Sequence, residues 1–438
     1  MDGRRASANA WQGRARFEPL SAALRHQLIA NYITWHHPFN PVLSGTDIQG
    51  LLRSQPGQYS PSQLLLNATF FIGGETIDSA SLIEAGFKNK QAARRIFFSR
   101  ALKADQARKA LYQRRYEKDP VINVQTLLLL SFSDSKGHLC GYPNACYNDC
   151  SMIGLALQVH RDNSKYMLGT EKEPFWRGLW WLCFAREQEL RWRYGHQPGT
   201  TTAGDVPMSV DEDPPFDLTV PGDLDVKGNQ DDAASNMLKL VCLRRIELFH
   251  GQFLRWSRLQ SLAHADGGNS PKPSSRVALL NGLLLWFSQL EPEIVSLASL
   301  ACPQNDCSYV AATHTARLLI MFNLQIFIVA DMTAIDPCQE VGYPKFETIN
   351  KVGQVRERAL QGLLQVTTAM CENGLIRVTS SEVLAQLIGT LTKHLIQSEH
   401  DAQEFRQSVG YISKLPDFET QTQELLLQLI RGLETRRL

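Results

Sequence analysis

The run from Phe175 to Ala185 constrains the fold of this chain more than any other stretch. Apolar residues fill almost every position, interrupted only by Arg177 and Gly178, and three of the eight tryptophans fall within six residues. A helix that is apolar on all sides is stable only when other helices surround it. We therefore predict a central buried helix over residues 175–185.

Apolar residues recur at helical spacing along most of the remaining chain. From Leu20 to Tyr32, for example, an apolar residue stands at every fourth position, which indicates a helix. The same reasoning predicts helices within 61–72, 88–118, 121–132, 144–160, 237–262, 276–300, 308–334, 347–374, 379–399 and 417–436. No stretch alternates apolar and polar residues long enough to indicate a sheet. The predicted fold class is all-α, a large multi-helix array with two helical halves joined by an acidic loop.

Changes in composition divide the chain into four regions. Residues 1–19 form a polar leader, and residues 20–204 form a first helical half that contains the tryptophan-rich run. Residues 205–235 hold nine acidic residues, four prolines and a single lysine, which is typical of an exposed acidic loop. Residues 236–438 complete the predicted domain organisation as a second helical half.

Composition excludes several classes of protein. The 438 residues carry a formal net charge of +1, so charge over the whole chain gives no argument for nucleic-acid binding. The N-terminus has no apolar segment of signal-peptide length, and the longest apolar run, 318–330, is too short to span a bilayer. We expect a soluble intracellular protein whose nine scattered cysteines are reduced and mostly buried.

Standard catalytic and metal-binding motifs are absent from the sequence. Cys146, Cys150 and His160 share one predicted helix face, but ten residues of helix separate Cys150 from His160 by about 15 Å, so one ion cannot bind all three. We interpret the Gly73–Gly74 pair as a helix stop, and His160 with Arg161 as the cationic end of a helix. The chain is therefore not expected to be an enzyme.

A local excess of positive charge lies between residues 88 and 118, with eleven Lys and Arg residues against two acidic ones. The apolar residues among them are at helical spacing, which predicts amphipathic helices with a basic outer face. A solvated helix face is the default interpretation. The alternative is a nuclear import or docking face, which would contain Lys88, Lys90, Arg94 and Arg95.

Six motifs follow one another along the chain, in residues 32–43, 92–116, 124–129, 155–162, 177–181 and 205–207. Their order resembles one family, the fungal-specific transcription factor domain. This domain is the middle homology region of fungal zinc-cluster transcription factors, and the similarity is to the branch of cutinase-type activators. The residues that match the signature, or stand at its positions, are Leu157, His160, Arg161, Asp162, Arg177, Leu179, Trp180, Trp181, Arg186, Pro198, Asp205 and Pro207.

The resemblance implies a helical regulatory domain that works in the nucleus through protein partners, such as other transcription factors or coactivators. Family members usually carry an N-terminal module of six cysteines and two zinc ions that binds DNA, whereas the first cysteine here is Cys140. We therefore expect no cofactor in this chain, zinc being implied only if such a module precedes it. Direct DNA binding and membrane association are not expected, while a dimer and a small-molecule effector stay open.

The leading hypothesis is a regulator of a fungal pathway, such as a biosynthetic or catabolic gene cluster, without a DNA-binding module of its own. One alternative is a truncated zinc-cluster activator. An alternative from another class is a helical enzyme or an inactive scaffold of a metabolic cluster.

Overall fold

The structure, a computed structural model, describes residues 20–53, 63–102, 119–132, 145–194, 236–250, 273–297, 306–335 and 346–373, with residues 375 and 387. Within these ranges the chain forms helices and turns and no strand, which confirms the all-α prediction. The predicted helices 379–399 and 417–436, apart from residue 387, and the acidic loop 205–235 lie outside the described ranges. The proposed division into two halves stays a prediction.

The helices follow the predicted order, with two additional short helices, over 45–53 and 79–84, that were not predicted. They are α2 (Ala22–Trp35), α3 (Gly45–Arg53), α4 (Gln63–Thr76), α5 (Ser79–Glu84), α6 (Lys90–Leu102), α8 (Pro120–Leu130), α9 (Ala145–Met167), α10 (Glu173–Tyr194), α12 (Pro273–Ser288), α13 (Pro292–Leu297), α14 (Asp306–Ile335) and α15 (Phe346–Glu372), and residues 236–250 are helical as well. Pro292 begins α13, so the predicted segment 276–300 is two helices.

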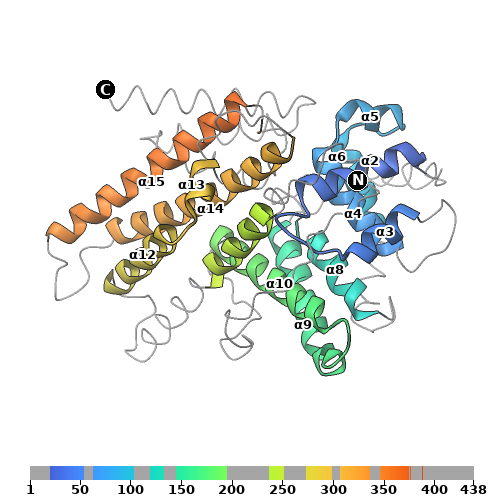
Figure 1. Cartoon of the computed structure of the whole chain (residues 1–438), viewed down its shortest axis with the longest axis horizontal. Helices are drawn as coiled ribbons and strands as arrows, with labels where there is room; N and C mark the ends of the chain where they lie inside the picture. The colour runs from blue at the N-terminus through green and yellow to red at the C-terminus, as the bar shows by residue number, and fades with distance from the viewer. Residues whose placement is uncertain are drawn as a thin grey trace, which may run out of the picture.

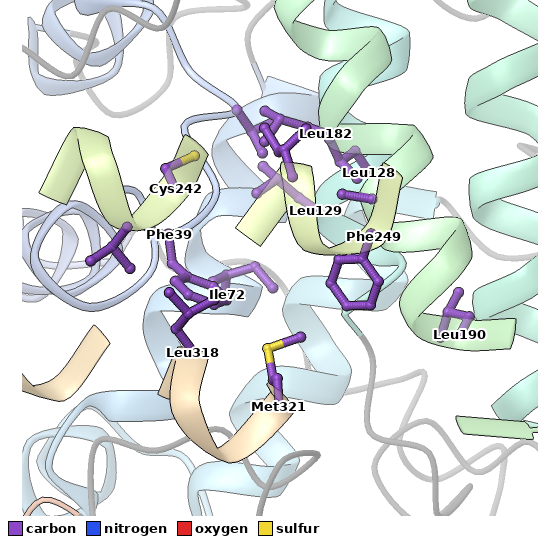
Figure 2. Packing of buried hydrophobic residues seen from close by; sticks show 14 of the residues in the cluster. Phe39, Ile72, Leu128, Leu129, Leu182, Leu190, Cys242, Phe249, Leu318 and Met321 are labelled. Carbon is purple, nitrogen blue, oxygen red and sulfur yellow. The ribbon is translucent and has the colours of Figure 1, made fainter. Parts of the chain in front are cut away.

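The helices pack as one group from α2 to α10 and another from α12 to α15 (Figure 1). In the first group, α4 contacts α2, α6 and α8, while α9 contacts α8 and α10. In the second group, α14 contacts α12, α13 and α15. Figure 2 shows that side chains from both groups, such as Phe39, Leu182 and Leu318, belong to one continuous core, which also includes Phe249 of the segment 236–250.

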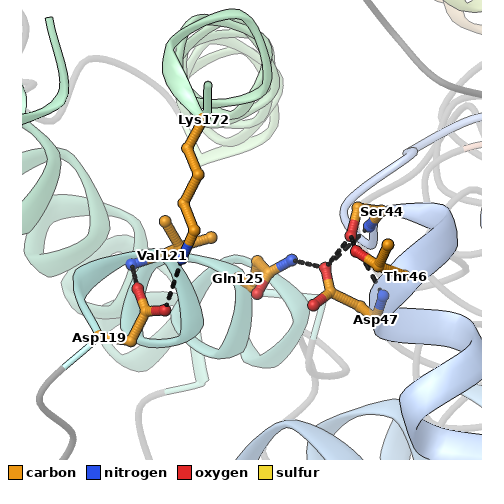
Figure 3. Close-up of polar contacts among 7 residues, drawn as sticks. All are labelled: Ser44, Thr46, Asp47, Asp119, Val121, Gln125 and Lys172. Atoms are coloured by element: carbon orange, nitrogen blue, oxygen red, sulfur yellow. Dashed lines mark hydrogen bonds and ion pairs between the residues drawn. The ribbon is translucent and has the colours of Figure 1, made fainter. Parts of the chain in front are cut away.

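Two of the helix starts are fixed by acidic side chains (Figure 3). Ser44 and Asp47 form a reciprocal capping box at the start of α3, with the Ser44 amide donating to Asp47 Oδ2 and the Asp47 amide donating to Ser44 Oγ. Asp47 also accepts a hydrogen bond of 2.8 Å from Gln125 Nε2, which joins α8 to α3. Asp119 caps α8 by accepting from the Val121 amide and pairs with Lys172 at 3.0 Å.

Within α14, the stretch from Tyr309 to Asp331 is apolar and long enough to pass as a membrane span by length and composition. This stretch is longer than the apolar run 318–330, because the helix continues through the polar residues on either side of that run. Most of the stretch is buried against the other helices, which is the pattern of a core helix in a globular fold.

The interpretation of Gly73–Gly74 as a helix stop is wrong, because α4 continues to Thr76. A Cβ atom on Gly73 would lie 2.0 Å from the carbonyl oxygen of Leu28 on α2. The glycine therefore permits the backbones of α2 and α4 to approach each other closely, and no flexible side chain is available to give way.

We expect Gly73→Ala to destabilise the protein by about 2 kcal/mol or more, because overpacking here acts on backbone atoms. Gly50→Ala is the matched control: Gly50 is exposed on α3 with open space around its Cβ position, so alanine should stabilise by about 0.5–1 kcal/mol. Urea unfolding midpoints of the two variants test this. Equal midpoints would contradict the close approach of α2 and α4.

Candidate functional site

The motif-rich stretch folds into a hairpin of two long helices, α9 and α10. The turn between them contains Gly169, whose φ of 73° lies in the left-handed region that favours glycine. The prediction of a buried helix at 175–185 is confirmed, since the side chains from Leu179 to Leu190 are buried in α10. The interpretation of His160 and Arg161 as a helix end is wrong, because α9 continues for seven residues to Met167.

His160 instead joins the two helices of the hairpin. Its ring stacks on Trp176 with ring centres 4.1 Å apart and planes 9° from parallel. Its Nε2 atom lies 2.8 Å from the Trp176 carbonyl oxygen, and the Trp176 indole donates to Ser164 Oγ at 3.2 Å. Burial lowers the pKa of His160 to about 4, and the hydrogen bond to Trp176 opposes this only in part. His160 is therefore a neutral packing residue at physiological pH.

The other signature residues separate into buried and exposed sets. Leu157, Leu179, Trp180 and Trp181 are buried in the core. Exposed signature residues are Arg161, Asp162 and Arg177. Arg177 pairs with Glu173 at 2.7 Å, and Asp162 accepts a hydrogen bond from Gln158. Pro198, Asp205 and Pro207 lie outside the described residues.

Arg186, the remaining signature residue, is fully buried on α10. It donates to the Ser131 carbonyl at 2.6 Å and pairs with Glu189 at 3.2 Å. Its guanidinium also lies 4.2 Å from the centre of the Phe132 ring. These contacts attach α10 to the end of α8.

Arg186 is one of three buried arginines that surround the turn following α2. Arg245, from the helical segment 236–250, donates to Asn40 Oδ1 at 2.7 Å and to Glu189 at 3.1 Å. Arg317, from α14, donates to the Trp35 carbonyl at 3.3 Å. Phe39 faces both of these guanidiniums, at 4.8 Å and 4.6 Å from its ring centre. We call Arg186, Arg245 and Arg317, together with the turn 36–40, the arginine junction.

The arginine junction encloses a small cavity. Its volume is about 10 Å³, and it is lined by His36, Phe39, Asn40, Glu75, Phe132, Glu189, Arg245 and Arg317. A second cavity of about 10 Å³ shares His36, Glu75 and Arg317 with the first and is otherwise lined by Asn31, Trp35, Ile72 and Thr76. Each volume corresponds to about one water molecule.

Arg245 and Arg317 lie outside the motifs identified in the sequence. Arg317 is the single cation in the apolar pattern 308–334, and Arg245 follows Arg244 in the apolar pattern 240–249, where a cation at a core position is an unusual residue. An arginine within an apolar pattern is the sequence signal for a buried cation, but it does not identify the residues that the arginine contacts. Residues 36–39 form a buried turn, in which the amides of Phe39 and Asn40 donate to the His36 carbonyl.

The predicted import or docking face needs one correction. Arg94 is buried with 3% of its surface exposed, because it donates to the Phe71 carbonyl at 3.1 Å and lies over the Phe71 ring. It belongs to the contact between α4 and α6. Lys88 and Arg95 are exposed and Lys90 is half-buried, so these three are the part of the predicted face that solvent reaches.

Metal ligands and thiols are the remaining candidates for reactive groups in the part of the chain that the structure describes. No group of three or more potential metal ligands occurs among these residues. Cys183, Cys242 and Cys371 are buried, as predicted for the cysteines in general. Burial raises the pKa of Cys242 to about 12 and that of Cys371 to about 11, which keeps both thiols protonated.

Comparison with known proteins returns fungal transcription factors. Cutinase transcription factor 1 beta of Fusarium vanettenii is 26% identical over 170 residues, which are 38% of this chain and 18% of that protein. A transcription factor of Fusarium pseudograminearum is 32% identical over 176 residues, with the same two shares. Transcription factor cpaR of Aspergillus oryzae is 29% identical over 190 residues, 42% of this chain and 29% of that protein.

The resemblance to the middle region of fungal transcription factors is confirmed by these matches. The matched region spans less than a third of the length of each relative. No protein-family model matches the chain, and no solved structure matches it significantly.

Because His160 is neutral in the folded protein, we predict that the free energy of unfolding falls as the pH is lowered through the acid range. The folded pKa of His160, about 4, lies below the unfolded value of about 6.5, so the unfolded chain binds more protons between these pH values. Stability from this residue is fully present above about pH 6.5 and declines as pH falls towards 4, by up to about 1.4 kcal/mol per pH unit.

We expect His160→Gln to remove this contribution, so that the free energy of unfolding falls less steeply between pH 6.5 and 4.5. His26→Gln is the matched control, because His26 is exposed on α2. Chemical unfolding at several pH values gives both slopes. A slope for His160→Gln equal to that of the parent chain would show that His160 is not held neutral.

Proposed function

We propose that the chain acts as the regulatory region of a fungal transcriptional regulator and works through protein partners in the nucleus. The observation that carries this proposal is the similarity to three fungal transcription factors over about two fifths of the chain. The motif order agrees with it, and three of the six motifs, 124–129, 155–162 and 177–181, lie in the helices α8, α9 and α10. Regulation of a biosynthetic or catabolic gene cluster is the finer form of this proposal.

The contacts of the signature residues support a scaffold role. His160 and Trp176 hold the α9–α10 hairpin together, and Arg186 attaches the hairpin to α8. These side chains are occupied by intramolecular contacts and are buried. A partner would therefore meet the exposed side chains of the same elements, and the packed helices would hold those side chains in fixed positions.

The exposed cations at the start of α6 are the surface that we propose for nuclear import or partner docking. Lys88 and Arg95 are exposed on either side of the first turn of the helix, while the neighbouring Arg94 is turned inward. Such a surface suits an acidic partner, since exposed charges contribute mainly to steering and selectivity.

A tethering experiment tests the regulatory role. The full chain, fused to a heterologous DNA-binding domain, should change transcription of a reporter that carries the matching site. The purified chain alone should show no sequence-specific DNA binding. An inactive fusion would contradict the regulatory role, and tight specific DNA binding by the chain alone would contradict a mechanism based on partners.

Charge reversal at Lys88 and Arg95, as Lys88→Glu with Arg95→Glu, should lower nuclear accumulation of a fluorescent fusion of the full chain several-fold. The matched control is Arg53→Glu with Lys165→Glu, which changes the charge equally at exposed sites on α3 and α9. Microscopy of the two variants at equal expression gives the comparison. Equal nuclear fractions would remove the basic face from the proposal.

A further inference from the structure

We propose that the arginine junction binds one small monovalent anion, of about the size of chloride, in the cavity beside Asn40, Arg245 and Arg317. This inference concerns the stability of the helical scaffold and does not depend on the proposed role in transcription. It rests on the unpaired donors, the charge and the size of the cavity.

The first observation is a set of buried donors that belong to residues lining the same cavity. Arg245 Nε, Arg317 Nε and Asn40 Nδ2 have no hydrogen-bond partner among the described residues. The three side chains are 0%, 6% and 2% exposed, and all of them line the cavity. Buried donors of charged groups are costly when they are left unpaired, so a ligand that accepts hydrogen bonds would be favoured here.

The second observation is an excess of positive charge around the cavity. Among the described residues, the guanidiniums of the junction belong to Arg186, Arg245 and Arg317, and the carboxylates that line the cavity belong to Glu75 and Glu189. The Glu189 carboxylate is already shared, lying 3.2 Å from Arg186 and 3.1 Å from Arg245. Within this set, three cations against two anions leave an excess of one positive charge, which a single monovalent anion would balance.

The histidines beside the cavity respond to the same charge. Burial lowers the pKa of His36 well below its usual value, and the nearby Arg317, Arg245 and Arg186 lower it further. Burial and Arg317 lower the pKa of His314 to about 3. Both imidazoles are therefore neutral at physiological pH, and the positive charge beside the cavity comes from the arginines.

The third observation is the size of the space. A cavity of about 10 Å³ admits one water molecule or one ion of similar size. Phosphate, sulfate and carboxylate ligands are too large for it. An anion in this position would contact the turn after α2, the segment 236–250 and α14 at once, and would stabilise the folded state by mass action.

Thermal unfolding of the full chain tests the proposal. Chloride is titrated against gluconate, a bulky monovalent anion, at constant ionic strength and pH, so that general screening stays the same. We expect the Tm to rise by a few degrees with chloride and then to level off. Equal Tm values in the two salts would overturn the proposal and leave the cavity to water.

Asn40→Asp provides a variant that should still fold, because the new carboxylate keeps the shape of the side chain and the acceptor for Arg245. The added negative charge should replace the bound anion, so the chloride dependence of Tm should be lost. Asn163→Asp is the matched control on α9, where the dependence should be unchanged. Chloride dependence that persists in Asn40→Asp would show that chloride acts elsewhere.

Bromide in place of chloride locates the ion directly. Crystals of the full chain grown or soaked in bromide should show an anomalous scattering peak within the arginine junction. A peak at this position supports the proposal. Its absence, with the crystals diffracting well enough to show bromide at other sites, overturns it.

Discussion

The buried turn 36–40 is the place where helices far apart in the sequence are joined. The Phe39 ring contacts the guanidiniums of both Arg245 and Arg317, and Arg245 also donates to Asn40. A buried guanidinium is costly when its donors and charge are left unsatisfied. The contacts of Arg245 and Arg317 attach the segment 236–250 and α14 to the turn after α2 and to its preceding residue, Trp35.

Helix α10 connects this junction to the rest of the core. Its first half is the tryptophan-rich apolar run, which packs on α9 through Trp176 and His160. Residues 186–189 in its second half are polar and also buried, and they contribute Arg186 to the arginine junction and Glu189 to the lining of its cavity. One helix thus supplies both hydrophobic packing and ionic contacts. A partner or ligand that perturbs either end would act on the same rigid element, which suits a regulatory scaffold.

Some errors of sequence interpretation share one physical cause. Gly73 and His160 were interpreted as helix-end residues, and Arg94 as a solvated cation, from properties of the local sequence alone. In the structure each is explained by a contact with another helix: Leu28 for Gly73, Trp176 for His160 and Phe71 for Arg94. Local propensity is a weak signal wherever tertiary packing supplies a close approach, a stacking partner or a carbonyl acceptor.

The sequence by itself determined the all-α class, the order of most helices and the resemblance to fungal transcription factors, because apolar periodicity and short motifs are local properties. Only the tertiary structure decided which polar residues are buried. The hydrogen bond between Arg245 and Asn40 joins residues 205 positions apart, and that between Arg317 and Trp35 spans 282. The sequence around each arginine does not identify such a partner, since the partner becomes a neighbour only when the helices have packed.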